Sequence, residues 1–96
     1  MTLHAGARVW MPCEVKAGPF SDERMVRITI EGVEWLGFAP VSALKDKIAE
    51  GRTFIQTLVL DVSGDNFLAQ PQAFGVTATP FKGSISKSQA LALGPL

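Results

Sequence analysis

Few side chains in this chain could carry out chemistry, and their spacing does not favour a reaction. His4 is the sole histidine, so a general base, a Ser-His-Asp arrangement or a histidine-bound metal would have to use this residue near the start of the chain. Cys13 is the sole cysteine, so no Cys/His pair stands at the spacing of a zinc site. Neither glycine-rich nucleotide fingerprint is present. We therefore expect no catalytic residue, no metal and no cofactor, and we do not expect an enzyme.

Carboxylates are the remaining groups that could act as acids or bases. Asp22 and Glu23 lie in a predicted loop, where functional sites are common, but a turn-capping Asp beside a solvated Glu is the preferred interpretation. Asp61 and Asp65 flank a Ser-Gly turn, and their spacing does not fit an EF-hand loop. A small-molecule pocket or an unrecognised enzyme, with Asp22 or Glu23 in its mouth, is one of three functional hypotheses.

The composition predicts one folded domain. The 96 residues are 47% hydrophobic and 19% charged, which is typical of a globular chain and not of a disordered one. The nine basic and nine acidic residues cancel, so the chain lacks the positive field that draws proteins to nucleic acid or anionic membranes without specificity. We expect a single domain over residues 1–96, with a barrel core at about 8–70 and a C-terminal hairpin or tail at about 71–96.

The cysteine content and the hydropathy pattern bear on location. Cys13 lies on the apolar parity of a strand with no base near it in sequence, which predicts a buried, inert thiol. A lone cysteine forms no intrachain disulfide, so the fold needs no oxidising compartment. No stretch resembles a signal peptide or approaches the ~18 apolar residues of a membrane span. These features predict a cytoplasmic protein without membrane contact.

A β-hairpin is the clearest local prediction. Gly32 supplies the positive φ of a tight turn between two strands. A two-residue loop would place Ile28 opposite Trp35 on a buried face and Met25 opposite Phe38 on the other face. A type I turn with a glycine bulge is an equally good alternative and would change these pairs. If the second face is uncovered, it is an apolar patch of the kind that contacts a partner or another copy.

A short helix is predicted after this hairpin. Ser42 is a suitable N-cap, Leu44 and Ile48 lie one helical turn apart, and Gly51 is a suitable stop. A helix over 43–50 would be too short to be stable alone, so it must dock its two apolar side chains on the barrel.

Apolar–polar alternation places the strands, and the tail is less regular. The apolar side of the fourth strand is expected to comprise Phe54, Leu58, Leu60 and Val62. The expected strands are residues 8–15, 25–30, 33–39, 54–62 and 66–70. In the tail we expect a sixth strand at 74–79, a turn at 80–83, pairing back at 83–86 and one helical turn at 88–93.

The predicted order of three strands, a helix and two strands favours a small antiparallel β-barrel, because closure removes exposed strand edges. That order is the one seen in OB-type barrels. Residues 37–44, Gly-Phe-Ala-Pro-Val-Ser-Ala-Leu, resemble the corner near the end of SH3 and bacterial SH3-type domains, where a strand leads into a short helical turn. The chain has no tyrosine, so the resemblance does not extend to the tyrosine-lined groove for proline-rich peptides. We expect a mainly β fold, SH3-like or OB-like, with about five to six strands and one short helix.

Six residues are candidates for a binding surface. Trp10 is either an exposed interface anchor or ordinary core, and core is preferred. Phe20 either points outward as a contact residue or plugs the mouth of the barrel, and the plug is preferred. Arg24 and Arg27 either bind an anionic partner or are balanced by nearby acidic residues, and balance is preferred. The full set is Trp10, Phe20, Asp22, Arg24, Arg27 and Phe38.

The leading hypothesis is a non-catalytic module that binds a protein or peptide, with its own copy as one candidate partner. A single-stranded nucleic-acid-binding barrel of OB type is the alternative, with bases stacked on aromatic side chains beside basic ones. Zero net charge weighs against that alternative.

Overall fold

The protein folds almost entirely into β-strands. The computed structural model describes residues 4–30, 32–73, 80–85 and 94–95. One turn of 3₁₀ helix, η1, covers Val41–Ala43. The strands are β1 (Arg8–Ala17), β2 (Glu23–Ile30), β3 (Val33–Pro40), β4 (Gly51–Ser63), β5 (Asn66–Pro71), β6 (Phe81–Ser84) and β7 (Gly94–Pro95).

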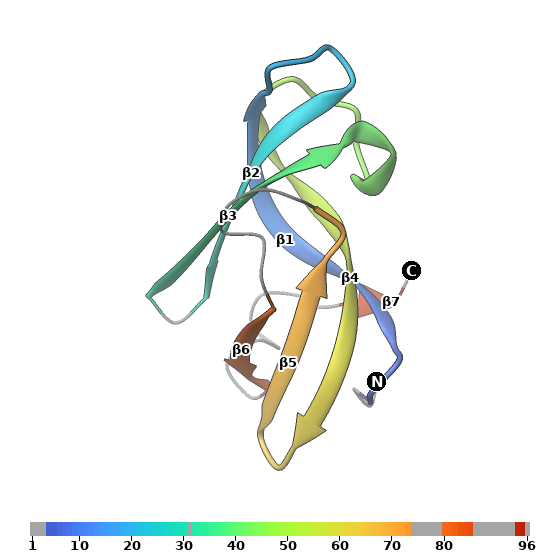
Figure 1. Cartoon of the computed structure of the whole chain (residues 1–96), viewed down its shortest axis with the longest axis vertical. Helices are drawn as coiled ribbons and strands as arrows, with labels where there is room; N and C mark the ends of the chain where they lie inside the picture. Colours follow the sequence, from blue (N-terminus) through green and yellow to red (C-terminus); the bar gives the residue numbers. More distant parts are fainter. Residues whose placement is uncertain (1–3, 31, 74–79, 86–93, 96) are drawn as a thin grey trace.

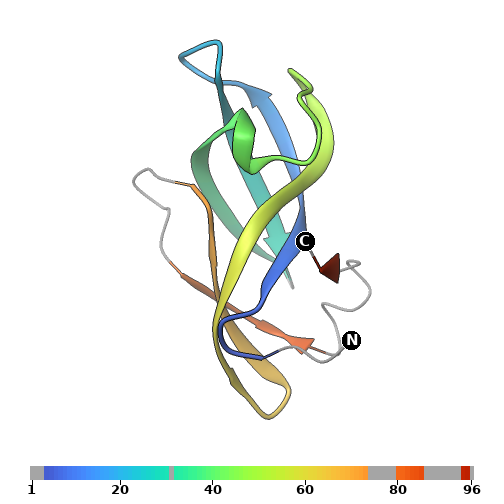
Figure 2. The same ribbon diagram turned by 90° about the vertical axis from the view of Figure 1, so that its right-hand side faces the viewer.

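All the strands belong to one antiparallel sheet that curls into a half-barrel (Figure 1). Neighbours along the sheet follow the order β3-β2-β1-β4-β5-β6, and β7 adds to β1. The long strands β1 and β4 pair from Arg8 to Val15 and form the middle of the sheet. Figure 2 shows η1 between β3 and β4, where the chain crosses the open side of the curl. The small, mainly β fold that the sequence predicts is confirmed.

The hairpin of β2 and β3 has the simpler of the two predicted registers. Ile28 pairs with Trp35 and Met25 pairs with Phe38, so the strands are joined by a two-residue loop. Gly32 in that loop has a φ of +79°, which an L side chain rarely adopts. Alternate residues of the hairpin therefore face the core, as predicted.

The core fills the concave side of the sheet. Every second residue of β1 from Val9 to Val15 is buried, as the apolar alternation predicts. Trp35 and Phe67 supply the large rings, from β3 and β5. The buried cluster consists of Met11, Cys13, Val15, Val26, Ile28, Trp35, Ala39, Ala43, Leu44, Ile55, Phe67 and Ala69.

The predicted buried side of β4 is wrong. The inward residues are Thr53, Ile55, Thr57 and Val59, whereas Leu58 and Leu60 are 38% and 39% exposed. The register with β1 is responsible, because Ile55 pairs with the buried Met11 and must share its face. A β-bulge between Val59 and Asp61 then changes the parity, so that Val62, opposite the buried Phe67, packs against the core. No single alternation therefore runs through the whole strand.

The predicted helix over 43–50 is also wrong. Within residues 41–50 only η1 is helical, and Leu44 forms an antiparallel bridge with Ile55. The N–H of Lys45 donates to the carbonyl of Phe54 at 2.9 Å, so β4 takes the hydrogen bonds that a helix would have formed within itself. Leu44 is buried and Ile48 packs against the core, so the predicted docking of these side chains is confirmed without the helix.

The tail differs from its prediction where it is described. Residues 81–84 form β6, which pairs with β5, so the turn predicted at 80–83 is wrong over most of its length. The strand predicted at 74–79 and the helical turn predicted at 88–93 lie outside the described residues.

Candidate binding surface

The outer face of β1, β2 and β3 carries a hollow of about 340 Å³. Cross-strand pairing builds it, since Lys16, Met25 and Phe38 form one row across the three strands, and Glu14, Arg27 and Leu36 form the next. Met25 is 45% exposed and Leu36 is 44% exposed. We call this site the β1–β3 hollow. Its lining residues are Glu14, Lys16, Met25, Val26, Arg27, Glu34, Leu36, Gly37 and Phe38.

The charges within the β1–β3 hollow are largely paired. The Arg27 guanidinium donates to the Glu14 carboxylate at 2.9 Å and lies 3.7 Å from that of Glu34. The hydrogen bond and the charge of Glu14 raise the pKa of Arg27 above its usual value, with a smaller contribution from Glu34. Arg27 is thus balanced by acids, as predicted, although sequence reasoning missed Glu14, which register alone brings opposite it.

Arg24 has a different role from Arg27. Its guanidinium donates to the carbonyl of Ile48 at 2.7 Å, of Ser21 at 3.0 Å and of Glu23 at 2.7 Å. These bonds tie the β1–β2 loop to the segment that precedes β4. The guanidinium of Arg24 is therefore used in contacts within the fold. This weighs against a role for Arg24 in binding an anionic partner.

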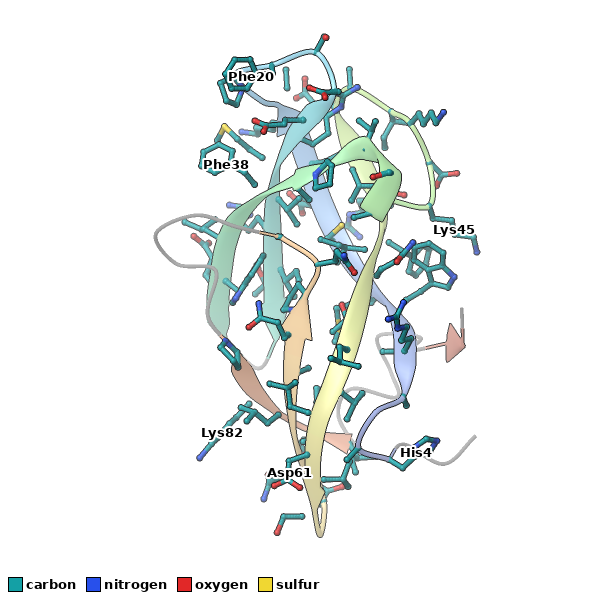
Figure 3. All side chains as sticks on the ribbon, turned by 45° about the vertical axis from the view of Figure 1, so that its right-hand side comes forward. His4, Phe20, Phe38, Lys45, Asp61 and Lys82 are labelled. Carbon is teal, nitrogen blue, oxygen red and sulfur yellow. The ribbon has the colours of Figure 1, made fainter. Side chains whose placement is uncertain are left out.

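Phe20 lies outside the core, so its predicted role as a plug is wrong. The side chain is 65% exposed, in the loop that follows Ala17 and precedes Glu23. Figure 3 shows Phe20 and Phe38 on the same side of the ribbon, toward the end that carries this loop. Asp22 is also exposed, and its backbone carbonyl accepts from the N–H of Val41 at 2.9 Å. The loop thus presents an exposed aromatic side chain at the end of the molecule that also carries Phe38.

Trp10 is neither a fully exposed anchor nor an ordinary core residue, the two alternatives predicted for it. It is half-buried on the outer face of β1, opposite Gln56 of β4 and Gly94 of β7. It shares that face with Phe54, which pairs with Pro12. Sequence reasoning missed this neighbour, because it assigned Phe54 to the buried side of its strand.

Cys13 and His4 are the other side chains that could carry out chemistry. Cys13 is buried, as predicted, and burial raises the pKa of its thiol to about 12. His4 is exposed, and its Nδ1 lies 3.0 Å from the carbonyl oxygen of Ala5. Among the described residues, no group of three or more His, Cys, Asp or Glu side chains is arranged to hold a metal ion.

Comparisons with known proteins add no relationship. A scan against models of protein families found no match, and searches of curated proteins and of solved structures found no significant match either. Within the ranges that the structure describes, no helix has the length and apolar character needed to cross a membrane.

Proposed function

We propose that this protein is a non-catalytic module that binds a protein or peptide partner through the β1–β3 hollow. The observation that carries the proposal is the exposure of Met25 and Leu36 beside Phe38 in one concave site. Apolar side chains gathered in a depression on a small domain are typical of contact sites. Phe20 extends this surface as an aromatic anchor, the residue class that dominates binding energy at interfaces.

The paired charges support a role in orientation. Exposed ion pairs such as Arg27 with Glu14 contribute little free energy, because solvent screens them. Around an apolar centre, however, such charges select the partner and set its register. The partner that fits is a segment with one or two apolar side chains for the floor of the hollow.

We propose an OB-type arrangement for the barrel in preference to an SH3-like one. Support comes from β1 lying between β2 and β4, and from the strand order β3-β2-β1-β4-β5, which OB-type barrels share. The free, buried Cys13 suits a reducing compartment, so we propose that the module acts in the cytoplasm.

The test is affinity capture from the lysate of the native host, with nuclease present and with each captured protein identified by mass spectrometry. Leu36→Glu places a charge in the hollow and should abolish capture of the partner. Leu60→Glu is the matched control, because Leu60 is 39% exposed on β4 and does not line the hollow. A partner that Leu36→Glu releases and Leu60→Glu retains would support the proposal.

Two outcomes would contradict it. If Leu36→Glu and Leu60→Glu both still capture the partner, the hollow is not the site that binds it. A small molecule that copurifies with the wild type and is lost from Leu36→Glu, with no protein captured, would make the site a ligand pocket, since its volume of about 340 Å³ falls in the range of such pockets.

A further inference from the structure

A second surface lies on the outer face of β1 and β4 and meets the β1–β3 hollow at Glu14. Residues that pair directly across an antiparallel ladder point to the same side of the sheet. Trp10 and Phe54 therefore share a face with basic residues at both ends of the row. We call this the β1–β4 strip, and its paired rows are Arg8 with Leu58, Trp10 with Gln56, Pro12 with Phe54 and Glu14 with Arg52.

Positive charge exceeds negative charge along the β1–β4 strip. Arg8 and Lys45 are exposed, and neither makes an ion pair within the described part of the chain. Arg52 has a side chain that is 89% exposed and lies 3.8 Å from Glu14. That carboxylate is held more closely by Arg27, at 2.9 Å. Glu14 therefore balances Arg27 more than Arg52, and Arg8 lies at the opposite end of the strip from this carboxylate.

The aromatic side chains lie among these cations. Trp10 and Phe54 occupy diagonal positions of adjacent rows, so the two residues are about 7–8 Å apart and their Cβ atoms somewhat closer. The Lys45 ammonium lies 5.3 Å from the centroid of the Phe54 ring, within the range of a cation–π contact. Both rings are half-buried, which fixes their orientation and leaves part of each accessible.

We propose that the β1–β4 strip binds single-stranded nucleic acid. Two neighbouring bases stack on Trp10 and Phe54, and Arg8, Lys45 and Arg52 contact the phosphates. Stacking on aromatic side chains beside a row of cations is the general means of holding single strands without reading their sequence. On binding, the Lys45 ammonium moves from the Phe54 ring to a phosphate and leaves the ring to a base. This site shares Glu14 with the β1–β3 hollow but has its own aromatic side chains and cations, and neutral net charge does not exclude it, because the cations are local.

The test measures fluorescence anisotropy of labelled oligothymidine and oligouridine of equal length, titrated with the intact protein over a range of salt concentrations. Three phosphate contacts predict that log K falls with log salt at a slope of about −2, since each contact to a single strand contributes about −0.7. Arg8→Ala and Lys45→Ala should each reduce the slope by about 0.7. Equal affinity for both oligonucleotides would indicate readout of base stacking and phosphate, and a preference for one would assign DNA or RNA as the ligand.

Two further variants separate this site from general electrostatics. Lys82→Ala removes an exposed lysine of β6, which Figure 3 shows far from Lys45, and should leave both affinity and slope unchanged. Trp10→Leu keeps an apolar side chain but removes the stacking surface, and should weaken binding about fivefold or more. Circular dichroism of each variant checks that it is folded.

Three outcomes would overturn the proposal. The first is no binding at low salt. The second is a slope that Lys82→Ala lowers as much as Lys45→Ala does. The third is that polyglutamate displaces the labelled oligonucleotide as well as unlabelled oligonucleotide does, while Trp10→Leu leaves the affinity for the oligonucleotide unchanged. That result would make the strip a surface for acidic peptides. Leu36→Glu in the hollow should leave nucleic-acid binding unchanged, so each proposal can fail without the other.

Discussion

The buried thiol of Cys13 couples folding to proton binding at alkaline pH. Its pKa rises from 9.0 to about 12 because burial disfavours the thiolate. The unfolded chain releases this proton near pH 9, whereas the folded chain keeps it until about pH 12. The stabilising contribution is therefore complete below pH 9 and is lost as pH rises toward 12.

We predict that the free energy of unfolding of the wild type falls by up to about 1.4 kcal/mol per pH unit through this group above pH 9. Urea titrations at several pH values between 8 and 10.5 would measure the slope. Cys13→Ala and Cys13→Ser should both be less stable than the wild type at pH 8. Both should also lack the part of the pH slope that comes from the thiol. A slope equal in all three proteins would show that the thiol does not contribute.

Two arginines three positions apart illustrate what the sequence could predict about individual residues. Arg24 and Arg27 both lie near acidic residues in sequence, so balance by acids was predicted for each, but it holds for Arg27 and not for Arg24, which bonds to backbone carbonyls. Their different roles depend on strand register and on the path of residues 44–50. Register gives Arg27 its contact with Glu14, and the position of Ile48 gives Arg24 one of its carbonyl contacts. Neither is encoded in local spacing.

Two buried threonines of β4 show how the segment before this strand is held. The Thr53 hydroxyl donates to the Asp46 carboxylate at 2.9 Å and accepts from the backbone N–H of Asp46 at 3.1 Å. The Thr57 hydroxyl donates only within its own strand, to the carbonyl of Ile55 at 3.2 Å. Both side chains are at most 3% exposed, so they differ in their partners and not in their burial.

We predict that Thr53→Val lowers the free energy of unfolding by about 1–3 kcal/mol, because it leaves the N–H and carboxylate of Asp46 without their partner. Thr57→Val should cost less than about 1 kcal/mol, since the shape is kept and no second segment is released. Chemical denaturation of the two variants gives the comparison. Equal losses would mean that the bonds to Asp46 do not secure the segment.

The same segment marks the limit of predicting elements from sequence. The β2–β3 hairpin was predictable down to its pairs, because alternation and Gly32 agree with each other. The helix over 43–50 was not, because its signals are local and its backbone bonds go to β4 instead. The inward side of β4 was also not predictable, since Thr53 and Thr57 occupy core positions while Leu58 and Leu60 face outward.

At the scale of the whole molecule, β1 and β4 are the strands on which the rest is assembled. They lie at the middle of the sheet and contribute Met11 and Ile55, both fully buried. We predict that their backbone amides exchange with deuterium most slowly, by global unfolding only, and that those of β6 exchange sooner. Hydrogen-exchange mass spectrometry would test this order, and slower exchange in β6 would contradict it.

Both proposed sites are properties of the assembled sheet. The Met25–Phe38 part of the β1–β3 hollow was predictable, because it needs only the hairpin register. The β1–β4 strip was not, because its paired rows join residues 38 to 50 positions apart through a pairing that no local pattern specifies.

The bulge in β4 gives this fold one position at which the length of the chain can change. Leu60 is the extra residue between Val59 and Asp61, whose partners Ala69 and Leu68 are consecutive. Many substitutions of this exposed leucine should be tolerated, because it fills no space in the core. Its deletion would remove the bulge and leave a regular ladder, in which Val62 still faces inward opposite Phe67. Related chains should therefore differ both in the identity of this residue and in its presence.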